Sequence, residues 1–128
     1  MASSLPALLL LLCSLGVAQA TLSLYGLRAV DLNGDTFTET DCYVQLFYDS
    51  GSARMTSVKD DDNNPSWNEG FVYPEAEQGR TLRVEVFDKD PIYDDKLGSC
   101  QYFLKRGTHD INCYLAEGGT LYFSYTLS

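Results

Sequence analysis

Four aspartates crowd into eight positions of the segment FDKDPIYDDKLG, residues 87–98. Asp88 and Asp90 are two residues apart, so in extended backbone their side chains point to the same side. Asp94 and Asp95 follow after the three-residue tip 91–93. Carboxylates that converge in this way raise one another's pKa values unless a cation offsets their charge. Ca²⁺ accepts about six to eight oxygen ligands in irregular geometry, which suits a loop, and the segment therefore predicts a calcium site.

Other metal ions and another kind of calcium loop fit this acidic segment less well. Mg²⁺ prefers strict octahedral geometry, and zinc prefers Cys or His, whereas the single His109 lies outside the acidic loops. An EF-hand loop that began at Asp88 would need Gly where Tyr93 stands and Glu where Ser99 stands. The remaining alternative is an acidic loop that is simply solvated.

Two further groups of aspartates lie between segments that resemble strands. Alternate turns of an antiparallel sandwich can gather at the same end, so these groups and residues 88–95 are expected to form one cup of carboxylates. The first group is Asp31, Asp35 and Asp41, and the second is Asp60, Asp61 and Asp62. We expect the second group to be mostly solvated.

Strand signals dominate the rest of the chain. Residues 42–48 (CYVQLFY), 82–87 (LRVEVF) and 120–127 (TLYFSYTL) are rich in β-branched and aromatic residues, and Gly, Asn, Asp and Pro clusters separate such segments. No window of helical length carries a 3.6-residue period. Seven or eight short strands in a chain of this length predict an all-β fold, an antiparallel β-sandwich, with Trp67 in its core.

The first twenty residues, MASSLPALLLLLCSLGVAQA, indicate where the protein is sent. The apolar run is too short to span a bilayer, and it ends in the small-x-small sequence 18–20. We interpret residues 1–20 as a secretory signal peptide and residues 21–128 as one small domain. A retained membrane anchor is the alternative. The expected location is extracellular.

The charge balance limits the partners of the domain. All 9 basic and 18 acidic residues follow Ala20, so the net charge of −9 belongs to the predicted domain. Such a chain does not bind nucleic acid or an anionic membrane through its own electrostatic field. It needs a cation in order to approach a membrane.

Three cysteines remain after the predicted signal peptide: Cys42, Cys100 and Cys113. An oxidising compartment favours a disulfide, but an odd number leaves one cysteine over.

Three segments, in this order, resemble the C2 domain, a calcium- and lipid-binding β-sandwich. They are TDCYVQLF (residues 40–47), NNPSWNEGFVY (residues 63–73) and LRVEVFDKDPIYDDKLG (residues 82–98). The resemblance covers roughly Leu22 to Leu127. It implies eight antiparallel strands in the second of the family's two permuted topologies, because only one strand precedes the first acidic loop and a strand follows residues 116–119.

Within the family, the pattern is most similar to C2 domains of the perforin type, which implies a Cys100–Cys113 disulfide. Cys42 is then either buried in a monomer or available to link a disulfide dimer. The resemblance also implies two or three Ca²⁺ ions held by first- and third-loop carboxylates, with Asp94 as an accessory ligand. Asp95 fits the principal third-loop position better than Asp94. The implied ligands are Asp35, Asp41, Asp88, Asp90, Asp94 and Asp95.

Apolar residues at the loop tips suggest how such a domain meets a membrane. Phe37, Ile92 and Tyr93 are expected to insert among lipid headgroups, and the alternative for Tyr93 is that its ring folds back onto its own loop. The resemblance implies a secreted, calcium-dependent phospholipid-binding module, acting in immune defence. The alternative is a module that binds protein or glycan and uses calcium only structurally. The sequence shows no nucleophile that pairs with a general base around His109, so we do not expect an enzyme.

Overall fold

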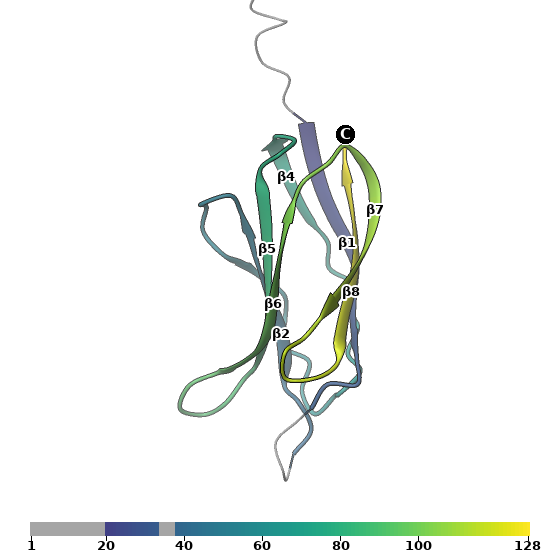
Figure 1. Ribbon diagram of the computed structural model, residues 1–128. Helices are drawn as coiled ribbons and strands as arrows, with labels where there is room; N and C mark the ends of the chain where they lie inside the picture. Colours follow the sequence, from purple (N-terminus) through teal and green to yellow (C-terminus); the bar gives the residue numbers. More distant parts are fainter. Residues whose placement is uncertain (1–19, 34–37) are drawn as a thin grey trace, which may run out of the picture.

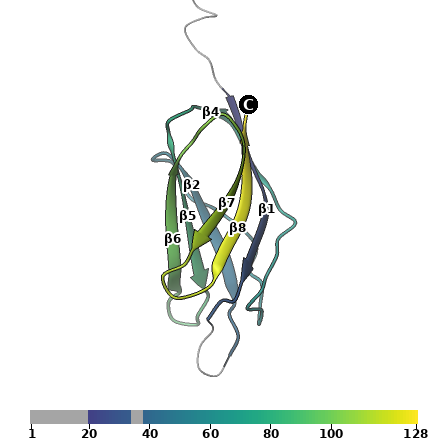
Figure 2. The same ribbon diagram turned by 45° about the vertical axis from the view of Figure 1, so that its right-hand side comes forward.

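The computed structural model describes residues 20–33 and 38–128, which form eight β-strands in two antiparallel sheets of four (Figures 1 and 2). The first sheet has the order β4 (Phe71–Ala76), β1 (Ala20–Val30), β8 (Thr120–Leu127), β7 (Gly107–Tyr114). The second has the order β3 (Arg54–Met55), β2 (Cys42–Tyr48), β5 (Thr81–Asp88), β6 (Asp95–Phe103). The predicted all-β sandwich is confirmed, and β8, the last strand, lies between β1 and β7.

The core forms because the central strands alternate residue by residue. In β5 and β8 every second residue is buried, so each strand has an inward row that is mainly apolar and an outward row that is mainly polar. The two inward rows pack between the sheets. Trp67 is 4% exposed and belongs to this core, as expected, and it lies four residues before β4 begins. Its indole N–H donates to the carbonyl of Ser57 (2.8 Å).

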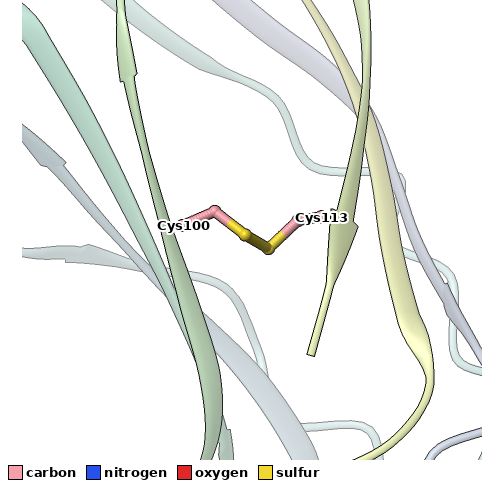
Figure 3. Close-up of a disulfide and its surroundings, with 2 residues drawn as sticks. All are labelled: Cys100 and Cys113. Atoms are coloured by element: carbon pink, nitrogen blue, oxygen red, sulfur yellow. A yellow bond between two sulfur atoms is a disulfide. The ribbon is translucent and has the colours of Figure 1, made fainter. Parts of the chain in front are cut away.

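A disulfide joins the edges of the two sheets. β6 and β7 are edge strands, and Cys100 and Cys113 bridge them (Figure 3), which confirms the predicted pairing. Cys42 is the free cysteine of the described residues and is 0% exposed. Its thiol is therefore shielded from a second copy, and the structure favours the buried alternative over the disulfide dimer.

Four connections gather at one end of the sandwich, the lower end in Figure 1: β1–β2, β3–β4, β5–β6 and β7–β8. We call it the acidic end, because residues 31–33, 38–41, 59–64 and 89–94 lie there. The loops between the other strands lie at the opposite end. Within residues 20–33 and 38–128, no helix is long and apolar enough to cross a membrane.

Candidate functional site

Asp88 ends the buried face of β5. Its side chain follows the inward residues Val84 and Val86 and is only 4% exposed. In the sheet ladder Asp88 stands opposite Cys42 on one side and Asp95 on the other. Residues directly opposite one another share a face of the sheet. The carboxylates of Asp88 and Asp95 therefore project to the same side at the acidic end.

Asp41 ties the three acidic loops together. Its backbone N–H donates to Oδ1 of Asp88 (2.9 Å), and its own Oδ1 accepts from the N–H of Asp61 (2.8 Å). Its carbonyl oxygen accepts from the N–H of Lys89 (2.9 Å). One residue thus fixes the end of the first loop against both the second and the third.

The second loop supports the first through amide side chains. Asn63 Oδ1 accepts from both the N–H (2.9 Å) and the hydroxyl (2.7 Å) of Thr40, which is fully buried. Asn64 Oδ1 accepts from the N–H of Asp31 (2.9 Å) at the start of the first loop. These two asparagines therefore bind both ends of the first loop.

Asp94 is held by two donors. The hydroxyl of Tyr43 donates to Oδ2, and the N–H of Asp90 donates to Oδ1 (3.1 Å). The hydroxyl and then the backbone N–H stabilise the charged form and lower the pKa of the Asp94 carboxyl. Burial, followed by the bond to Asp94, raises the pKa of Tyr43 to about 12. Asp94 thereby closes the tip of the third loop.

Carboxylates and apolar side chains line one pocket at this tip. The pocket has a volume of about 330 Å³ and is lined by Asp90, Pro91, Ile92, Tyr93 and Asp95. Ile92 is 89% exposed and Tyr93 is 74% exposed, so the Tyr93 ring lies largely in solvent. Hard oxygen donors and an apolar tip therefore share one surface.

The structure brings five of the predicted ligands to one end, and they are Asp41, Asp88, Asp90, Asp94 and Asp95. Two predicted residues, Asp35 and Phe37, lie outside the described residues. Among the residues that are described, no group of three His, Cys, Asp or Glu side chains is close enough to hold a metal ion. The oxygen donors suit Ca²⁺ in chemical type. In the arrangement described, however, both oxygens of Asp94 already accept hydrogen bonds from protein groups.

Sequence reasoning missed Tyr43 as the partner of Asp94. Tyr43 lies next to Cys42, near the start of β2, and its ring stacks on Phe87 with centroids 5.3 Å apart. In the sequence this tyrosine is one position of the segment TDCYVQLF, which resembles the C2 domain. Its distance along the chain from Asp94 gave no local signal of the contact.

Comparisons with known proteins agree with the C2 fold. The family model described as "C2 domain" matches residues 20–117. Human perforin-1 is 38% identical over 106 residues, which cover 80% of this chain and 19% of perforin-1. Human extended synaptotagmin-1 is 44% identical over 71 residues, covering 55% of this chain and 6% of that protein. The chain thus spans less than a fifth of the length of these relatives.

Solved structures agree with the sequence comparison. One described as "Structure of a C2 domain" superposes with a TM-score of 0.82 at 46% identity, covering 85% of this chain and 98% of the other. A calcium-bound structure of the C2A and C2B domains of extended synaptotagmin 2 gives a TM-score of 0.76 at 28% identity, covering 87% and 46%. With the family match over residues 20–117, these findings show that the chain belongs to the C2 domain family.

Proposed function

We propose that this chain is a secreted, calcium-dependent phospholipid-binding module without enzymatic activity. The observation that carries the proposal is the pocket at the tip of the third loop. There Asp90 and Asp95 lie beside Ile92 and Tyr93, so cation ligands and an exposed apolar tip share one surface. A membrane surface offers both partners that this surface needs, phosphates for a bound cation and an apolar interior for the tip.

The proposed ligands are the carboxylates of the first and third loops, with Asp94 as an accessory. Bound Ca²⁺, two or three ions, would leave coordination positions open to lipid phosphates. An extracellular module of this kind is expected to have a Kd of about 10⁻⁴–10⁻³ M. The principal ligands of the proposal are Asp35, Asp41, Asp88, Asp90 and Asp95.

Electrostatics explains why binding should need the cation. The net charge of −9 repels the chain from anionic lipid, and several of the carboxylates lie at the end that carries the apolar tip. A cation that offsets this charge would let Ile92 and Tyr93 reach the headgroup region, and Phe37 is the proposed contact of the first loop. The attraction is electrostatic and should weaken with added salt.

The relatives add support of a general kind. C2 domains often bind calcium and phospholipid membranes, and one structural relative at 28% identity is calcium-bound. The similarity to perforin-1 suggests a role in immune defence. The predicted signal peptide at residues 1–20 suggests an extracellular location, where calcium is plentiful.

Vesicle sedimentation tests the proposal. Vesicles of phosphatidylcholine and phosphatidylserine are mixed with the protein in calcium or in chelator, and we expect co-sedimentation only with calcium. The double variant Asp88→Asn/Asp90→Asn should abolish it.

The matched control is Asp49→Asn/Asp110→Asn, which removes the same charge away from the acidic loops and should bind normally. Equal sedimentation of the unmodified protein in calcium and in chelator would contradict the proposal. A calcium-stabilised protein that never sediments would favour the alternative in which calcium is only structural.

A further inference from the structure

We propose that the membrane-binding surface includes a fourth segment, the β7–β8 hairpin, and that Tyr114 is its contact with the lipid headgroups. This inference rests on the proposed function and extends it to a residue outside the three acidic loops. The occupant of the surface is a phospholipid bilayer.

Exposure singles out Tyr114. Among the large apolar side chains of the described residues, the three most exposed are Ile92 (89%), Tyr93 (74%) and Tyr114 (73%). The first two form the tip of the third loop. Next in order is Phe103 (69%), at the far end of β6. Exposed aromatic groups that form part of one surface favour a partner with an apolar interior.

The sheet register places Tyr114 at the acidic end. Tyr114 in β7 stands opposite Thr120 in β8, and Thr120 stands opposite Val30 in β1. Val30 is the last residue of β1, so the first acidic loop begins directly beyond this row. The three side chains share the outer face of the sheet. Because none of them carries a charge, this part of the surface loses water at lower cost than the carboxylates do.

The hairpin is attached firmly to the loops beside it. The N–H of Glu117 donates to the carbonyl of Leu97 (3.0 Å) in β6, and Asn33 Nδ2 donates to the carbonyl of Glu117 (2.7 Å). The turn is thus bonded both to the first loop and to the strand that carries Asp95. A membrane that meets these loops meets the hairpin in a defined orientation.

A glycine makes this close attachment possible. Gly119 has a φ of +84°, and a Cβ there would lie 2.7 Å from the carbonyl oxygen of Val30 and 2.8 Å from that of Asp31. No side chain fits without moving backbone atoms. The backbone of the hairpin therefore lies directly against the start of the first loop.

The chemistry of a tyrosine fits a headgroup contact better than deep insertion. The ring has an apolar body and a polar hydroxyl, and such side chains are enriched where a bilayer meets water. Tyr114 lies on the side of the sandwich, whereas Ile92 and Tyr93 lie on a loop tip. Together they would fix the tilt of the domain as well as its depth.

The test compares Tyr114→Ser with Phe103→Ser in calcium-dependent vesicle partitioning. We expect about fivefold weaker partitioning for Tyr114→Ser, from the loss of apolar contact, and no change for Phe103→Ser at the other end. The two positions are similarly exposed in water, so general effects of losing a surface aromatic group should be equal.

A second variant reports contact directly. Trp67 is the only tryptophan and is buried, so the unmodified protein provides a baseline with brominated lipids. Tyr114→Trp should show added, calcium-dependent quenching by bromines near the headgroups. If the unmodified protein binds but Tyr114→Ser partitions normally and Tyr114→Trp is not quenched, this inference is wrong and the proposed function stands. If the unmodified protein does not bind in calcium, the proposed function itself fails.

Discussion

The hydroxyl of Tyr43 donates a hydrogen bond to Asp94, 51 positions later in the chain, and thereby joins β2 to the tip of the third loop. The same carboxylate accepts the N–H of Asp90 and so closes the tip that carries Ile92 and Tyr93. From this contact we infer that Asp94 positions the tip, whereas the sequence left its role open against Asp95.

Tyr43→Phe tests that role. The variant removes the hydroxyl but keeps the ring that stacks on Phe87, so the core should remain folded. We expect faster amide hydrogen exchange across residues 89–95, because Asp94 loses one of its two donors. Tyr48→Phe is the control, since its hydroxyl accepts the N–H of Glu77 at the opposite end. Unchanged exchange in residues 89–95 would show that the bond does not order the tip.

Substitution of Asp94 and of Asp95 should show which of the two binds calcium directly and which supports the loop. Asp95 is exposed and lines the tip pocket, whereas both oxygens of Asp94 are already bonded. We expect Asp94→Asn to weaken calcium binding about tenfold, as the loss of a supporting group does, and Asp95→Asn to weaken it more. Isothermal titration with calcium measures both. The reverse order would make Asp94 the principal ligand.

Asn63→Ala should destabilise the fold through a residue in another loop. Thr40 is fully buried, and its N–H and hydroxyl would both lose their acceptor. An unsatisfied buried donor costs about 1–3 kcal/mol, which urea unfolding can resolve. Asn64→Ala is the control and should cost less, because the Asp31 N–H that it bonds is exposed to water. Equal losses of unfolding free energy in the two variants would argue against a special role for Asn63.

Cys42 should resist alkylation in the folded protein. Burial, together with the charges of Asp88 and Asp62, raises the pKa of the Cys42 thiol from 9.0 to about 12. Because the folded pKa is the higher one, its contribution to stability is complete below pH 9 and is lost as the pH rises towards 12. In a protein of residues 21–128, which lacks Cys13, iodoacetamide in chelator at pH 8 should label one thiol, and only after denaturation. Rapid labelling of the native protein would contradict the buried position.

Reduction of the Cys100–Cys113 disulfide should lower the free energy of unfolding. The two cysteines are 13 positions apart, and a loop of this length predicts a loss of roughly 3 kcal/mol. Urea unfolding with and without a phosphine reductant measures the loss. Cys42 is a free thiol in both samples, so only the disulfide changes. Coincident unfolding curves would mean that the disulfide constrains little.

Local patterns predicted the parts of the fold that depend on near neighbours. The alternation of LRVEVF and TLYFSYTL appears in the structure as β5 and β8, because side chains of a strand point to opposite faces with a period of two. The crowding of Asp88, Asp90 and Asp95 identified a candidate site, since converging carboxylates demand an explanation wherever they occur. The net charge of −9 likewise predicted that the chain does not bind nucleic acid through its own electrostatic field.

Tertiary structure decided what depends on distant partners. Asp94 faces Tyr43, and Asn63 bonds Thr40, because the sandwich brings separate loops to one end. The same packing buries Cys42 and attaches the turn at Gly119 to the first loop. The sequence by itself determined which side chains carry charge and which strands alternate, since these are local properties. Which oxygen is free and which tyrosine is exposed depend on contacts across the sandwich, and only the folded chain specifies them.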